Sequence, residues 1–197
     1  SKKFAAYPRL NPFAIGKSIS AADLIDQSML AYNGGRLREA AQLLAKKMLP
    51  DDGFIGMSLT GALTPAGLGK SCIIPLMKGG YVDWIISTGA NLYHDLHFGL
   101  DMHLHSGTPF LDDVELHDEG VIRIYDVLFP AQVLLDTDHF IREFLVQSGL
   151  DGPVSSADLH YALGRHLLKV RPGCDEYSLV ARAAKCGVPI YTSSPGD

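Results

Sequence analysis

The chain has 197 residues, 47% of them hydrophobic, and a formal net charge of −5, a composition that excludes a disordered chain and favours one folded core. Lysines and arginines are scattered without a basic stripe, which argues against nucleic acid as a partner. The apolar runs, roughly 8–10 residues long, are too short for a membrane helix, no signal peptide is visible, and three scattered cysteines fit a reducing cytoplasm.

The first part of the chain is predicted to be helical after an irregular arm. Residues 1–19 form this arm, because two prolines disfavour regular pairing. A capping-box pattern at 20–23 begins a helix that we expect to stop at Asn33–Gly35. A second helix is predicted over 36–49, so that residues 20–50 make a helical hairpin.

The region 51–197 is predicted to be α/β. Two nearly continuous apolar runs, 53–60 and 81–88, read as buried strands, and a turn and a helix ending at Gly79–Gly80 separate them. Strand, helix and strand in this order indicate a βαβ unit in a parallel sheet. We expect the lone Trp84 to lie in the core.

The remaining pattern extends this fold. It predicts a strand at 120–128, helices at 130–147, 155–169 and 175–186, and a last strand at 188–192. The helix at 155–169 is expected to begin with a Ser155–Ser156 cap, and Gly187 is expected to close the helix at 175–186. The order predicts a doubly wound, mostly parallel, Rossmann-like sheet. Because the chain stops just after a strand, at the edge where such folds place ligands, we expect a C-terminal part to be absent from it.

Two turns are candidate ligand sites. Thr64–Ser71 is one residue short of a P-loop, with Thr64 in place of the first glycine. Pro65 removes an amide that a phosphate cradle would use, so we favour a turn that approaches another nucleotide, with an NTPase or plain turn chemistry as alternatives. Residues 87–91 either admit a ligand or cap a helix. Since parallel strands end at one edge, the two turns are expected to form one crevice.

A run of histidines is the third candidate, formed by His94, His97, His103 and His105. Three such ligands and a water would suit a metal-dependent hydrolase, although isolated hydrogen-bonding histidines are the default interpretation. If His94 lay in the crevice, it could instead move a proton near neutral pH. The acidic stretch 112–119 is interpreted as a solvated loop.

Taken together, these residues resemble the deoxyhypusine synthase family. The matching segments are 55–68, 77–95 and 187–197. The resemblance implies an NAD-dependent transferase that oxidises spermidine, passes its aminobutyl group through an imine on a lysine and delivers it to an acceptor amine. That acceptor is a protein lysine or a small amine such as putrescine or agmatine. The resemblance covers nearly the whole chain but only about the first half or more of a typical member.

The resemblance also implies the site residues. Those that would bind NAD are Ala62, Leu63, Thr64, Pro65, Thr88, Gly89, Ala90 and Asp197. Tyr93 and His94 stand where the family has a glutamate pair, and Asp95 matches the acid that follows. These three are expected to bind substrate, and His94 is also the candidate catalytic residue. The Tyr93–His94 departure resembles the deoxyhypusine synthase-like branch.

The resemblance leaves the chain incomplete. The nucleophilic lysine belongs to the segment after residue 197, so we expect no activity without a second polypeptide or the missing part. A cytoplasmic homotetramer built as a dimer of dimers is expected, as in the family. The alternatives are a metal-dependent hydrolase that uses the four histidines and a non-catalytic NAD-binding subunit.

Overall fold

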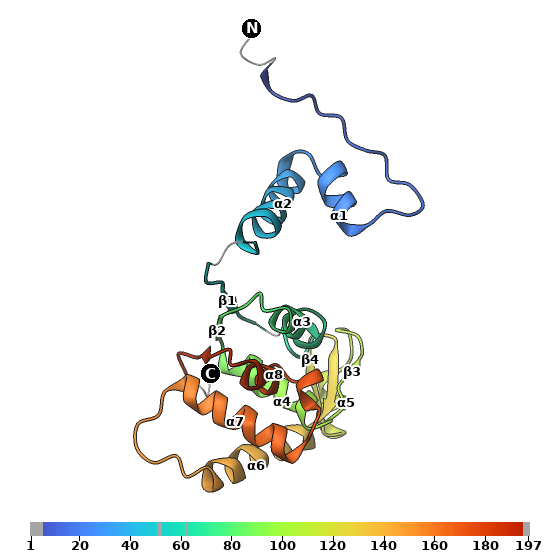
Figure 1. Cartoon of the computed structure of the whole chain (residues 1–197). Coiled ribbons are helices and arrows are strands. Elements are labelled where there is room, and N and C mark those ends of the chain that lie inside the picture. The colour runs from blue at the N-terminus through green and yellow to red at the C-terminus, as the bar shows by residue number, and fades with distance from the viewer. Residues whose placement is uncertain (1–5, 51–52, 62, 195–197) are drawn as a thin grey trace. The chain divides into compact units, whose positions relative to one another are not determined.

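The computed structural model describes residues 6–50, 53–61 and 63–194 (Figure 1). Contacts divide the chain into two compact units, Ser1–Gly53 and Phe54–Asp197. Among the described helices, each is too short or too polar to cross a lipid bilayer.

The first unit contains two helical segments, as predicted. The first is α1 (Ala21–Asp23) with the π-helical turn η2 (Leu24–Ser28), and the second is α2 (Tyr32–Leu43) with η3 (Leu44–Met48). The expected stop at Asn33–Gly35 is wrong, because these residues form the first turn of α2. Glycine costs a helix only about 1 kcal/mol relative to alanine, through lost backbone freedom, and this cost does not prevent the helix from starting there.

The second unit is built on a parallel sheet in the order β1–β2–β6. Its strands are β1 (Gly56–Leu59), β2 (Trp84–Ser87) and β6 (Ile190–Tyr191). The π-helical turn η4 (Gly69–Ile73) and α3 (Ile74–Lys78) connect the first two strands. The predicted βαβ unit, the α/β class and the final strand are therefore confirmed.

The two faces of this sheet differ. Along β2, Ile85 and Ser87 are buried, whereas Trp84 and Ile86 are 40% and 43% exposed. The prediction that Trp84 lies in the core is therefore wrong. An apolar run shows that a strand can be buried on both faces, but it cannot show that both faces are covered.

Helices pack on the buried face of this sheet and on one another. They are α4 (Gly89–Gly99), α6 (Gln132–Gln147), α7 (Ser156–Val170), the 3₁₀ turn η5 (Cys174–Glu176) and α8 (Leu179–Cys186). The predicted cap of α7 is confirmed, since Ser155 Oγ accepts from the Asp158 amide at 3.1 Å. The helix predicted at 175–186 is instead split, because Ser178 begins α8 by capping the Ala181 amide.

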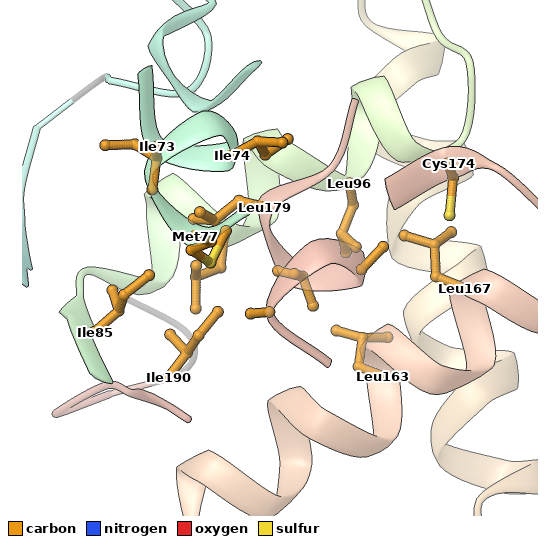
Figure 2. Close-up of a cluster of buried hydrophobic side chains, with 14 of the residues drawn as sticks. Ile73, Ile74, Met77, Ile85, Leu96, Leu163, Leu167, Cys174, Leu179 and Ile190 are labelled. Carbon is orange, nitrogen blue, oxygen red and sulfur yellow. The ribbon is translucent and has the colours of Figure 1, made fainter. Parts of the chain in front are cut away.

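The core joins the sheet to these helices. Figure 2 shows side chains from β2, β6, α3, α4, α7, η5 and α8 meeting in one cluster, including Ile85, Ile190, Met77, Leu96, Leu167, Cys174 and Leu179. Gly164 permits the close approach of α7 and α8, because a Cβ there would lie 2.4 Å from the Val180 carbonyl oxygen. This packing fixes α4 against the end of β2.

A small antiparallel sheet, ordered β3–β5–β4, lies beside this core (Figure 1). Its elements are β3 (His105–Ser106), α5 (Asp113–Asp118), β4 (Val121–Ile124) and β5 (Val127–Pro130). The single strand predicted at 120–128 is thus a hairpin, with Tyr125 at φ 56° in its turn. A tyrosine in left-handed conformation gives no glycine-like signal, which explains the error. The expected solvated loop at 112–119 contains the exposed helix α5.

Candidate functional site

The loops that follow β1 and β2 are hydrogen-bonded to each other. We call residues 60–68 the first loop and residues 87–91 the second loop. The amides of Leu63 and Thr64 donate to Asn91 Oδ1 at 3.1 and 3.3 Å, and Thr64 Oγ1 donates to the Asn91 carbonyl at 2.6 Å. The two loops therefore lie side by side at the carboxyl edge of the sheet, and the single crevice expected between them stays a prediction.

The first loop is a closed turn and differs from a phosphate cradle. The amides of Gly67, Leu68 and Ser71 donate to backbone carbonyls within the turn and its helix. Gly67 has φ 82°, a left-handed conformation that suits glycine. Because a P-loop directs such amides at phosphate oxygens, this geometry gives the NTPase alternative no support. The same turn, through Pro65, lines a cavity of about 360 Å³ shared with β3 and β5.

Unused hydrogen-bonding groups gather at this sheet edge. Among the described residues, the buried side-chain atoms without a partner are Thr88 Oγ1, Asn91 Nδ2 and Thr192 Oγ1. Thr88 follows β2 and Thr192 follows β6, its parallel neighbour, so both lie at the carboxyl edge. A buried polar group left unpaired costs about 1–3 kcal/mol, which makes this edge suitable for a polar ligand.

The second loop also begins a helix. Thr88 is the N-cap residue of α4, but its side chain makes no capping hydrogen bond. Gly89 and Ala90 then form the first turn, whose amides have no intrahelical acceptor. Such a helix start favours anionic oxygen atoms. The predicted residues Thr88–Ala90 thus stand beside Leu63–Pro65, whereas Ala62 and Asp197 lie outside the described residues.

Tyr93 is bound to α6 through its hydroxyl group. The single hydroxyl hydrogen of Tyr93 is shared between two acceptors, Asp138 Oδ1 at 2.8 Å and the Leu134 carbonyl oxygen at 3.0 Å. Burial and the neighbouring carboxylate raise the pKa of Tyr93 above its ordinary value, so the phenol stays neutral. Asp138 was missed at the sequence level, because nothing in the chain links it to a residue of a different helix. It brings an exposed carboxylate next to the position where the family has glutamates.

His94 and His97 form a pair, and the other two histidines lie apart from them. His94 Nδ1 is 3.0 Å from His97 Nε2, and His97 Nδ1 is 2.9 Å from Thr137 Oγ1. Burial lowers the pKa of His94, and burial together with His94 lowers the pKa of His97 to about 4. His103 and His105 are exposed. Within the described residues no group of three potential ligands could hold a metal ion, so the four-histidine metal centre of the hydrolase alternative is not assembled.

Asp95 is engaged inside the protein. It is 1% exposed and accepts from Ser178 Oγ at 2.6 Å and from the amides of Leu179 and Val180 at 2.7 and 2.9 Å. Its carboxylate therefore caps the start of α8. Burial raises its pKa to about 6, against the lowering effect of these three donors. The geometry gives Asp95 a structural role, and its predicted contact with substrate stays a prediction.

Comparison with known proteins agrees with this arrangement. The family model described as deoxyhypusine synthase matches residues 23–197. A deoxyhypusine synthase-like protein of Nostoc sp. is 51% identical over 96% of this chain and 50% of its own length. The corresponding protein of Thermosynechococcus vestitus is 48% identical over 95% of this chain and 47% of its own length.

The fold comparison reaches beyond these relatives. A crystal structure assigned to a deoxyhypusine synthase of Entamoeba histolytica has a TM-score of 0.62, with 16% identity, over 94% of this chain and 62% of that one. At this identity the match supports the α/β fold alone. The chain spans about half the length of the curated relatives it matches. With the family model covering most of its residues, the chain belongs to the deoxyhypusine synthase family.

Proposed function

We propose that this chain supplies the dinucleotide-binding part of an NAD-dependent aminoalkyl transferase of the deoxyhypusine synthase-like type. The enzyme would move the aminobutyl group of spermidine to an acceptor amine, either a protein lysine or a small amine such as putrescine or agmatine. The observation that carries the proposal is the joining of the first and second loops through Asn91, beside three unpaired buried polar atoms.

The residues at this edge fit a dinucleotide. Thr88 and Thr192 offer hydroxyl groups, and Asn91 Nδ2 offers two donor hydrogens to ribose or phosphate oxygens. Leu63–Pro65 and Thr88–Ala90 would hold NAD, with Ala62 and Asp197 as further predicted contacts. When bound, NAD supplies an acceptor for hydride.

Tyr93, Asp138 and His94 would meet the polyamine. The Asp138 carboxylate attracts an ammonium group, and the face of the Tyr93 ring can add a cation–π contact. This replaces the charge that the family places on a glutamate pair. A carboxylate on α6 thus reduces the difference between this chain and the family pattern.

The nucleophilic lysine is proposed to lie outside this chain. Lys70 is the lysine nearest the first loop in sequence, and its ammonium group lies 4.3 Å from the centre of the exposed Tyr177 ring. A lysine that forms an imine needs a desolvated pocket, which this exposed position does not provide. The cytoplasmic homotetramer expected from the family is part of the same proposal.

The test combines the chain with the part of the Nostoc sp. relative that it does not match. The two polypeptides are coexpressed, and release of 1,3-diaminopropane from spermidine is measured with and without NAD. The proposal expects release that requires NAD and both polypeptides. NAD binding without release under any acceptor would instead favour the non-catalytic subunit, and neither binding nor release would refute the proposal.

A further inference from the structure

Three side chains connect α4 to α6 by a continuous run of hydrogen bonds. The run passes from His94 Nδ1 to His97 Nε2 over 3.0 Å, and from His97 Nδ1 to Thr137 Oγ1 over 2.9 Å. Both His97 and Thr137 are fully buried. The His97 ring is therefore held at both of its nitrogen atoms.

The Val133 carbonyl sets the direction of this run. Thr137 Oγ1 lies 2.8 Å from that carbonyl oxygen, which can only accept a hydrogen bond. Two oxygen atoms at this distance repel each other unless the hydroxyl hydrogen lies between them. The Thr137 hydroxyl therefore donates its single hydrogen to the Val133 carbonyl and accepts from His97 Nδ1–H.

This direction determines the tautomer of His94. With its hydrogen on Nδ1, His97 has a lone pair on Nε2, so His94 must donate from Nδ1–H. The lone pair of His94 is then on Nε2, for which the described part of the chain records no partner. His94 is half-buried and lies three residues after Asn91 on the same helix.

The groups around His94 keep it neutral. Its ring lies edge-on to Tyr93 and His97, with centroids 5.6 and 5.1 Å away, and to Phe129 of β5, 6.2 Å away. Tyr93 is a neutral phenol, and burial lowers the pKa of His97 to about 4. The charged group from α6 on this side is Asp138, which is bound to the Tyr93 hydroxyl. Burial also lowers the pKa of His94 itself.

We propose that His94 Nε2 is the base that takes a proton from a substrate ammonium group, and that His97 and Thr137 are positioning residues that hold His94 in its Nδ1–H tautomer. This inference rests on the proposed function. In the step, R₂NH₂⁺ and neutral His94 give R₂NH and imidazolium. The N–H bond of the ammonium group breaks, and its electron pair stays on the amine nitrogen. The Nε2 lone pair forms the new N–H bond, so neither molecule is oxidised or reduced. The neutral amine is the form that can be oxidised at its α-carbon or attack an imine.

The first arm of the test reads the tautomer directly. Ring ¹⁵N shifts of the ¹⁵N-histidine-labelled 197-residue chain are measured at pH 7.5, with His94 assigned by His94→Gln. The inference expects a protonated Nδ1 and an unprotonated Nε2. Thr137→Val keeps the side-chain shape but removes the acceptor of His97 Nδ1–H. The His97 hydrogen then moves to Nε2 and is donated to His94 Nδ1, so the Nε2–H form of His94 increases. Thr137→Ser restores the wild-type ratio, and Thr108→Val, on an exposed loop, leaves it unchanged.

The second arm measures diaminopropane release by the coexpressed protein across pH. We expect His94→Gln to lower kcat/KM about 100-fold and Thr137→Val about tenfold, with recovery in Thr137→Ser and unchanged NAD affinity. Wild-type His94 in the Nε2–H form overturns the inference even if a variant fails to fold. The inference is also overturned if folded Thr137→Val shows the same His94 tautomer and the same kcat/KM as the wild type. If the wild type releases no diaminopropane, the proposed function falls and takes the base role of His94 with it, whatever the tautomer shows.

Discussion

Asn91 and Asp95 lie one turn apart on α4, and both are fully buried polar residues, but they use their hydrogen-bonding groups differently. Asp95 meets three donors from Ser178, Leu179 and Val180 and closes the junction between α4 and α8. Asn91 accepts from two amides with Oδ1 and leaves Nδ2 without a partner. A buried polar group whose hydrogen bonds are all made stabilises the fold. A buried polar group without a partner indicates a place where a ligand can supply the missing hydrogen bond.

The Asp95 junction should show the largest effect on stability. Asp95→Ala leaves two backbone amides and a hydroxyl without their acceptor, and we expect the free energy of unfolding to fall by about 3 kcal/mol. Urea unfolding followed by circular dichroism measures it. Asp151→Ala, on an exposed loop, is the control and should stay within about 0.5 kcal/mol of wild type. Equal losses of unfolding free energy in the two variants would contradict the structural role of Asp95.

Asn91→Ala tests the bridge between the loops. The amides of Leu63 and Thr64 lose their acceptor, so we expect a loss of about 2 kcal/mol in the same unfolding experiment. The loss is smaller than at Asp95 because no charge is involved and the amide atom Nδ2 is already unpaired. A change below about 0.5 kcal/mol would mean that the bridge does not join the loops in solution.

The contribution of the Asp95 carboxyl group to stability can be measured through its pH dependence. Burial raises its folded pKa to about 6 from 3.8, so the folded state binds this proton more tightly than the unfolded chain. Its contribution to stability is therefore largest below pH 3.8 and falls as pH rises to 6. We expect the stability of wild type minus that of Asp95→Asn to fall by more than about 1.4 kcal/mol across this window, the equivalent of one pKa unit.

Subtracting the Asn variant isolates Asp95. The contribution of His97 to stability depends on pH in the opposite sense, because it decreases as pH falls below 6.5. His97 is present in both proteins, so its contribution cancels in the difference. A difference that is flat, or that rises with pH, would show that the Asp95 carboxylate is stabilised as an anion by its three donors.

Thr88→Val should separate stability from binding. Because the buried Thr88 hydroxyl has no protein partner, replacing it with a methyl group should raise the free energy of unfolding by about 1 kcal/mol. It should weaken NAD binding to the coexpressed protein about fivefold, the value of one hydrogen bond near 1 kcal/mol. Calorimetric titration measures the affinity, and Thr108→Val is the matched control. A destabilised variant with unchanged NAD affinity would show that the Thr88 hydroxyl stabilises the fold and does not bind NAD.

Local signals in the sequence predicted much of the fold. The glycine pair that ends α3, the Ser155 cap of α7 and the Gly187 stop of α8 all act within one turn of their own residue, and each was predicted correctly. The meeting of the two loops followed from the parallel strand order. These features need only neighbouring residues or a topology rule.

What the sequence did not predict depends on distant partners. Asp95 binds residues more than 80 positions away, and Thr137 and Asp138 reach α4 from another helix. The exposure of Trp84 depends on what covers the sheet, which an apolar pattern does not record. Polar residues in helices look alike in sequence until packing brings them together, so the hydrogen-bond run from His94 could not be foreseen.

The most direct test is a crystal structure of the coexpressed protein soaked with NAD. If the first and second loops form the cofactor site, the dinucleotide will lie along the carboxyl edge of β1, β2 and β6, with its polar atoms within hydrogen-bonding distance of Thr88 Oγ1 and Asn91 Nδ2. NAD bound elsewhere, or an empty edge at saturating NAD, would contradict the central claim.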